Sequence, residues 1–106
     1  MSLLKDTATG NAAISKTSTP SGDSALDSIM LHLSAAGGAG NLTVTIDAIS
    51  GAEYDTVLLT QDMTLVTDLL WQPDRPIELD SGDKIVIAWA NGAGRTYGLV
   101  IKWLGR

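Results

Sequence analysis

Apolar and polar residues alternate along most of this chain with a period of two, which is the spacing of a β-strand with one buried face. The clearest case is the segment 42–48, where Leu42, Val44 and Ile46 would face one side and Thr43 and Thr45 the other. Similar short runs recur between clusters of turn-forming residues. We therefore expect strands at 26–33, 42–48, 54–60, 65–71, 76–79, 84–90 and 96–104, with a further short strand near 11–16.

This arrangement predicts an all-β fold: an antiparallel β-sandwich, jelly-roll-like, with seven to eight short strands. Residues 62–70 also fit an amphipathic helix, but the β-branched Thr64, Val66 and Thr67 favour a strand there. We expect the loop at 91–94 to close a hairpin, because Asn and Gly tolerate positive φ.

The first 25 residues differ from the rest, since they are rich in Thr, Ser, Ala and Gly. A chain of 106 residues fits one domain. We place the β-sandwich domain at residues 26–106 and expect residues 1–25 to form an amino-terminal arm with the first short strand. Such an arm is either frayed, as termini often are, or ordered against a neighbouring subunit.

The charge of the chain is acidic, with 7 Lys and Arg against 12 Asp and Glu and a net charge of -5. No basic residue lies between Lys16 and Arg75, so we expect neither nucleic acid nor an anionic membrane as a partner. Cysteine is absent, which excludes disulfides and thiolate metal sites and suits folding in a reducing cytoplasm. We expect no secretory signal, because residues 1–7 contain no long apolar run.

No group of residues in the sequence predicts catalysis, a cofactor or a metal ion. His32 is the only histidine, and the segment 22–26 matches the Gly-Asp-Ser-Leu esterase block without that family's late Asp-x-x-His pair. Asp80 and Asp83 lie in a turn that lacks the ligand spacing of a calcium loop, so a turn is the first interpretation and calcium stays open. We therefore expect a protein that is not an enzyme.

The aromatic residues favour packing or an interface. Trp71, Trp89 and Trp103 each fall in phase with aliphatic neighbours on their strands, which is typical of a core or a subunit contact. A sugar-binding platform is the alternative. We expect a partner interface that includes Leu3, Leu4, Trp71 and Trp103.

A set of segments within residues 26–104 gives the chain a further likeness. These are Ile46-Asp47, the run 54–59, Trp71-Gln72-Pro73-Asp74, and the run 76–79 that leads into 82–85. In this pattern the sequence resembles small virion structural proteins that tailed bacteriophages encode near their capsid genes.

That resemblance implies a jelly-roll or related sandwich that decorates or cements the capsid, commonly as a homotrimer, or a head–tail or tail adaptor. It carries no family functional residue onto this chain. The expected partners are further copies of the chain and viral capsid or tail proteins, and the expected location is the virion after folding in the host cytoplasm. The alternative function is a carbohydrate-binding β-sandwich module on a virion or secreted enzyme, with a glycan as partner.

Overall fold

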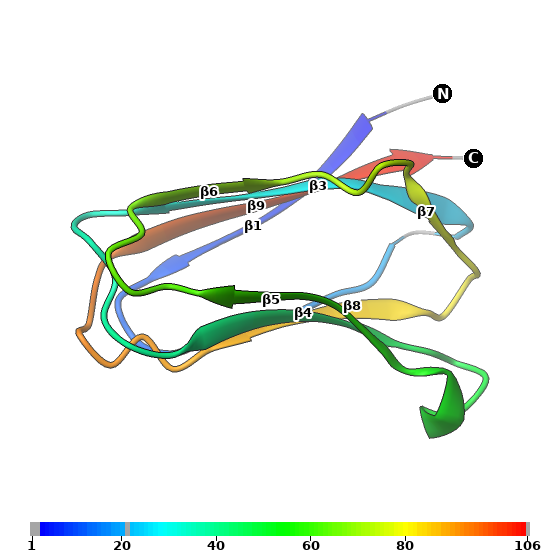
Figure 1. The fold of residues 1–106 in the computed structure, drawn as a ribbon. Coiled ribbons are helices and arrows are strands. Elements are labelled where there is room, and N and C mark those ends of the chain that lie inside the picture. The colour runs from blue at the N-terminus through cyan, green and yellow to red at the C-terminus, as the bar shows by residue number, and fades with distance from the viewer. Residues whose placement is uncertain (1–2, 21, 106) are drawn as a thin grey trace.

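The computed structural model describes residues 3–20 and 22–105, and over these residues the chain is almost entirely β-structure (Figure 1). One short 3-10 helix, η1, interrupts the strands. The elements in chain order are β1 Leu3–Gly10, β2 Ile14–Ser18, β3 Ser24–Leu33, β4 Asn41–Asp47, η1 Ala52–Tyr54, β5 Thr56–Asp62, β6 Asp68–Trp71, β7 Ile77–Leu79, β8 Lys84–Trp89 and β9 Tyr97–Gly105.

Two antiparallel sheets face each other. Sheet A has the strand order β1-β9-β3-β6, with β7 paired to β3 beside β6, and sheet B has the order β2-β8-β4-β5. Because β6 and β7 pair with successive parts of β3, they share one place in sheet A. The described strands therefore occupy four places in each of the two sheets. The first strand pairs with the last, the second with the eighth, and so inward along the chain. This nested winding is that of a jelly roll, so the predicted fold class is confirmed.

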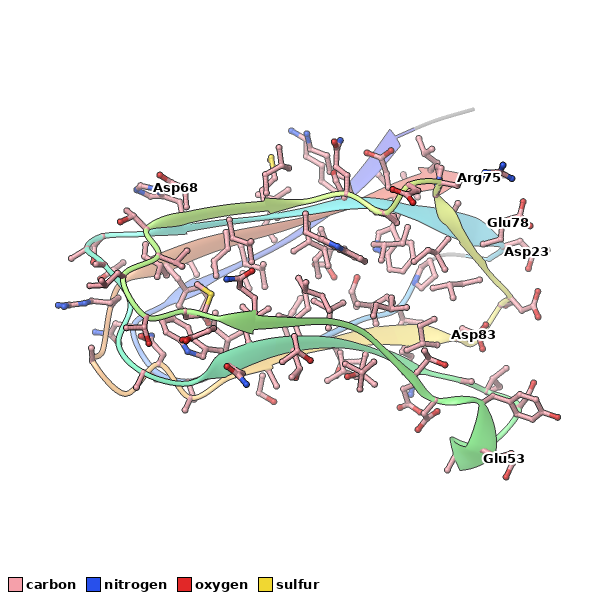
Figure 2. All side chains as sticks on the ribbon, viewed as in Figure 1. Asp23, Glu53, Asp68, Arg75, Glu78 and Asp83 are labelled. Atoms are coloured by element: carbon pink, nitrogen blue, oxygen red, sulfur yellow. The ribbon has the colours of Figure 1, made fainter. Side chains whose placement is uncertain are left out.

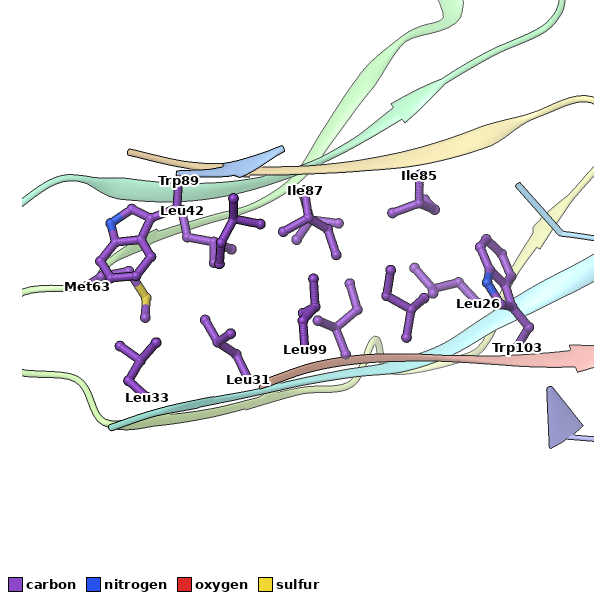
Figure 3. Close-up of a cluster of buried hydrophobic side chains, with 14 of the residues drawn as sticks. Leu26, Leu31, Leu33, Leu42, Met63, Ile85, Ile87, Trp89, Leu99 and Trp103 are labelled. Carbon is purple, nitrogen blue, oxygen red and sulfur yellow. The ribbon is translucent and has the colours of Figure 1, made fainter. Parts of the chain in front are cut away.

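The core lies between the sheets and is built from one face of each strand (Figure 3). On β9, Leu99, Ile101 and Trp103 are buried, while the alternate residues face outward. On β8 the buried side chains are Ile85, Ile87 and, at the end of the strand, Trp89. Burying each such side chain contributes about 2 kcal/mol. The alternation seen in the sequence therefore determines which face of each strand enters the core.

A register shift in β3 changes this alternation at one point. The pairing with β9 moves by one residue between Leu26 and Ser28, which leaves Asp27 as the extra residue of a β-bulge. Strict alternation would put Leu26 on the same outward face as Ser28 and Met30. The bulge instead turns Leu26 into the core, where it is fully buried.

In the region where we expected an amino-terminal arm, the described residues form two strands of the sandwich. β1 pairs with β9 over eight registered residue pairs, and β2 pairs with β8 over five. Both are edge strands of the sandwich, so the predicted boundary at residue 25 does not separate two structural parts. Edge strands with one solvated face need few apolar residues, which is why Thr- and Ser-rich composition resembled a terminus. Met1 and Ser2 lie outside the described residues.

Two connections also differ from expectation. The loop at 91–94 joins β8 of sheet B to β9 of sheet A, so it crosses between sheets and closes no hairpin. Its turn chemistry was still as predicted, because Asn91 and Gly94 have φ values of 49° and 66°. The strand predicted at 65–71 is shorter than expected, since Leu65 has a φ of 64° and β6 begins only at Asp68.

A chain of polar contacts closes the sandwich between β1 and β2. The buried Trp103 indole donates a hydrogen bond to the Ser18 hydroxyl over 3.0 Å, and that hydroxyl also hydrogen-bonds to the Asp6 carboxylate. The Lys16 ammonium lies 3.1 Å from the same carboxylate. Partial burial opposes ionisation of Asp6, but these hydrogen bonds and the nearby positive charge outweigh it, so the pKa of Asp6 lies below 3.8. The network connects both sheets through their edge strands.

Two loops meet at the end of the sandwich that lies far from the chain termini (Figure 1). Gly37 donates its N–H to the Val66 carbonyl and accepts the N–H of Leu65, while Met63 donates to Gly40. A Cβ atom on Gly37 would lie well inside 3.0 Å of the Met63 carbonyl oxygen. The close approach of the two backbones therefore requires glycine at this position.

We expect Gly37→Ala to lower the free energy of unfolding by about 2 kcal/mol, because backbone on both sides must shift. Gly92→Ala is the matched control, since nothing lies within 4 Å of its Cβ position, and it should change stability by less than about 0.5 kcal/mol. Urea unfolding followed by tryptophan fluorescence measures both. Equal stability of the two variants would contradict the close approach.

The Asp6 network predicts a pH-dependent contribution to stability. A lowered folded-state pKa stabilises the fold above the unfolded-state pKa, and this contribution disappears as the pH falls through the folded-state value. Because the pair is partly exposed, Asp6→Asn should cost only about 0.5 kcal/mol at pH 7. Urea midpoints of the variant and the wild type should converge as the pH falls through the folded-state pKa of Asp6. A deficit that persists unchanged once Asp6 is protonated would assign the loss to packing instead.

Candidate functional site

The outer face of sheet A carries an open apolar depression. Val100 of β9, Met30 of β3 and Leu70 of β6 lie in one cross-strand row and face outward. With residues of the next two rows they line a depression of about 340 Å³. Its lining is Met30, Leu31, His32, Asp68, Leu69, Leu70 and Val100. We call this feature the sheet-A depression. Its volume lies at the lower end of the range for small-molecule pockets.

His32 and Asp68 form the polar rim of the sheet-A depression. They are direct cross-strand partners on β3 and β6, and the imidazole Nδ1 hydrogen-bonds to the Asp68 carboxylate. Both side chains are about 70% exposed, at 71% and 72%. Figure 2 shows Asp68 on the outer side of sheet A, at the end of the sandwich away from the termini. An exposed pair of this kind contributes little stability but sets the polarity of the rim.

Leu65 projects from the connection between β5 and β6 near the same end. Its side chain is 81% exposed, and its φ of 64° is one that a bulky L-residue adopts at a cost of about 1 kcal/mol. The conformation is held by its N–H, which donates to Gly37, and by the N–H of Val66, which donates to Met63. Leu65 gains neither burial nor backbone relaxation within the chain.

Asp62 fixes the start of the same turn. Its carboxylate accepts the Thr64 N–H over 3.0 Å and the Thr64 hydroxyl over 2.8 Å. Both hydrogen bonds lower the pKa of Asp62 and keep it ionised, and the one from the Thr64 backbone has the larger effect. The turn that carries Leu65 therefore also carries a fixed negative charge.

A second exposed apolar surface lies around η1, at the opposite end of the sandwich (Figure 1). Ile49, Tyr54 and Val57 are 64%, 61% and 57% exposed. The Asp55 carboxylate accepts the N–H of Ala48 over 2.8 Å and fixes the approach to the turn. We call these three exposed residues the η1 corner, whose position Glu53 marks in Figure 2.

Asp83, near the η1 corner, accepts hydrogen bonds from the backbone of two turns. The two carboxylate oxygens of Asp83 accept the N–H groups of Ile49 and Asp80, each over 2.9 Å. Among residues 3–20 and 22–105 no three His, Cys, Asp or Glu side chains gather closely enough to hold a metal ion. The Ser24 hydroxyl of the esterase-like segment is buried, so it presents no nucleophile at the surface.

The predicted interface residues are not brought together on one surface. Trp103 is 2% exposed and hydrogen-bonded within the core, which leaves its indole no area for a partner. Trp71 is half-buried and faces inward beside Ile29. Leu4 is 39% exposed on the edge strand β1, on the inward side, while the side chain of Leu3 lies outside the described part. Among the expected interface residues whose side chains are described, Leu4 and Trp71 retain exposed area for the contact that we expected.

The placement of the tryptophans also bears on sugar binding. Trp89 and Trp103 are both 2% exposed, so of the two expected roles, core or subunit contact, both residues have the core role. Tyr97 is half-buried and in register with Leu33 on the core side. Tyr54 is the one strongly exposed aromatic side chain in the described residues, and a single ring forms no platform.

Sequence reasoning missed the residues that do form exposed apolar surface. Leu70 was detectable, because Leu69, Leu70 and Trp71 are consecutive on one strand, where the middle side chain must face the other side. Leu65 was not detectable, since it lay inside the predicted strand. The η1 corner was hidden in the same way, because Tyr54 and Val57 began a predicted strand.

Searches of protein-family models and of curated protein sequences gave no match to this chain. The described residues contain no helix with the length and apolar character needed to span a bilayer.

Leu69 and Leu70 are neighbours on β6 whose side chains lie on opposite faces of sheet A, and this assignment can be tested. We expect Leu70→Ser to change the free energy of unfolding by less than about 0.5 kcal/mol, because its side chain is already in water. Leu69→Ser should cost about 2 kcal/mol, since Leu69 packs against the core. Urea unfolding should be measured where the midpoint is independent of protein concentration. Similar losses in both variants would contradict the assignment of faces.

Proposed function

We propose that this chain is a non-enzymatic structural protein of a bacteriophage virion, and that it decorates the capsid as a symmetric oligomer. The observation that supports this most is the presence of two separate exposed apolar surfaces on one small sandwich. One comprises the sheet-A depression with Leu65, and the other is the η1 corner at the opposite end. Exposed apolar groups of this kind mark sites of protein contact.

Two surfaces suit a decoration protein because it makes two kinds of contact. One surface joins copies of the chain to each other, and the other attaches the assembly to the shell. In a symmetric oligomer each shell contact is repeated, so individually weak contacts add to a firm attachment. A homotrimer is the oligomer that the resemblance to small virion proteins implies.

The η1 corner is the surface that we assign to the shell. Tyr54 lies in η1 and Val57 at the start of β5, and the backbone at Ala48 and Ile49 is fixed by hydrogen bonds to Asp55 and Asp83, so little ordering entropy is lost on binding. Tyr54 supplies an aromatic ring with a hydroxyl, the kind of side chain that commonly dominates binding energy. A net charge of -5 also keeps the free protein from packaged DNA.

Other virion proteins could take the place of the capsid protein as the partner of the η1 corner. A tail or head–tail protein would present an equivalent repeated surface at a different place in the particle. The glycan-binding alternative has less support, because two of the three tryptophans are buried in the core. Folding in the host cytoplasm followed by assembly into the virion agrees with a chain that lacks cysteine.

Tyr54→Ser should weaken cosedimentation with particles of the encoding phage by about tenfold without unfolding the chain. Thr60→Ala is the control, as it changes an exposed side chain on β5 that lies outside both the η1 corner and the sheet-A depression. Binding is measured on particles stripped of the protein, with light scattering after size exclusion to report the oligomer. Wild-type protein that ignores capsids and tails, yet binds a glycan in fluorescence titrations, would overturn the proposal.

A further inference from the structure

We infer that copies of this chain associate head to tail, with Leu65 of one copy inserted into the sheet-A depression of the next. This inference rests on the proposed symmetric oligomer and names the contact that would build it. The occupant of the depression is thus a second copy of this chain, and the recognised group is a branched aliphatic side chain on a rigid turn.

Leu65 supplies the first argument. A leucine at a φ of 64° with 81% of its surface in water is unfavourable in the isolated chain, for both the backbone and the side chain. Glycine or asparagine would suit this backbone better. Three backbone hydrogen bonds between the loops hold the turn in place, so the position of the Leu65 side chain is fixed. Burial in a neighbouring copy would compensate for both unfavourable terms.

The sheet-A depression supplies the second argument. Its exposed wall is formed by Met30, Leu70 and Val100, and all three side chains are apolar. Gly98 lies in the next row of the sheet, and no atom lies within 4 Å of where its Cβ would be, which leaves the depression open on that side. A volume of about 340 Å³ admits one aliphatic side chain together with part of its turn.

Charge supplies the third argument. Lys5 and Lys102 are direct cross-strand partners on the outer face of sheet A, in the row next to Val100. Like charges placed opposite each other are unfavourable, and within residues 3–20 and 22–105 neither lysine forms an ion pair. Asp62 lies on the turn that carries Leu65, and within the described residues no cationic side chain pairs with it. Inserting Leu65 would bring the Asp62 carboxylate of one copy toward the lysines of the next.

The two surfaces lie on different parts of the molecule, which determines the symmetry. Leu65 lies on the connection that runs from β5 of sheet B to β6 of sheet A, whereas the sheet-A depression opens on the outer face of sheet A. A contact between two different surfaces is heterologous, so repeating it generates a closed ring or an open filament. The expected homotrimer is the smallest ring of this kind, and it buries every Leu65 and every depression.

The experiment separates the projecting residue from the depression. Leu65→Asn should weaken self-association by about tenfold or more while the melting temperature of the monomer stays equal or rises, because Asn tolerates this backbone. Leu70→Glu places a charge at the edge of the depression and should also abolish self-association. Ile49→Ser, an equally exposed apolar residue at the η1 corner, should retain the wild-type mass. Mass is measured by light scattering over a dilution series.

Mixing the two defective variants gives the decisive result. Leu65→Asn keeps an intact depression and Leu70→Glu keeps an intact Leu65, so together they can form one contact and no more. The expected product is a 1:1 dimer of about twice 11.1 kDa from two proteins that are each monomeric. No dimer on mixing, or a Leu65→Asn variant that keeps the wild-type mass, would overturn the inference.

Failure of the inference is distinguishable from failure of the proposed function. A wild-type trimer that is unaffected by both substitutions would overturn the head-to-tail contact and leave capsid decoration standing. A wild-type monomer that still cosediments with particles would do the same. If Leu70→Glu instead loses particle binding at unchanged mass, the shell protein occupies the depression and the inference is wrong. Loss of cosedimentation by every variant and the wild type would count against the function alone.

Discussion

The packing of β3 and β9 against β4 and β8 is the constraint on which the rest of this structure depends. These central strands supply most of the fully buried side chains, and their alternation leaves no choice about which residues face inward. The bulge at Asp27 in β3 adjusts this alternation, and it keeps Leu26 in the core where strict alternation would expose it. Trp103 adds a polar constraint, because its buried indole N–H must find an acceptor and Ser18 provides it.

This use of residues explains where a function can reside. Most large aromatic side chains pack in or against the core. The carboxylates at the turns, such as Asp55 and Asp83, accept hydrogen bonds from backbone N–H groups. What remains for contact with other molecules is the outward row of sheet A and the turns at the two ends. These surfaces are apolar and shallow, which suits the binding of a protein surface better than the enclosure of a small substrate.

The alternation that predicts a strand is a local property of the sequence, so most strands could be predicted. The sandwich could be predicted because sheets with one apolar face must bury that face against a second sheet. It could not predict pairing, since β1 meets β9 across nearly the whole chain and a Thr-rich edge strand resembles a loose terminus. The loop at 91–94 had the right turn residues but joined different sheets. Leu65 was missed for another reason: its φ depends on hydrogen bonds to Gly37, which lies in a distant loop. The exposed site therefore depends on non-local contacts that no local pattern encodes.

The nested winding also relates the candidate surfaces to the chain itself. Pairing the first strand with the last places both described chain ends at one end of sheet A, and the loop that carries Leu65 comes from the middle of the sequence at the other end (Figure 1). The Lys5 and Lys102 pair lies between the two, contributed by the outermost strands of the winding. A contact that joins Leu65 to this face therefore joins the middle of one chain to the paired ends of another. Such a contact depends on the completed fold, so association would follow folding and would not compete with it.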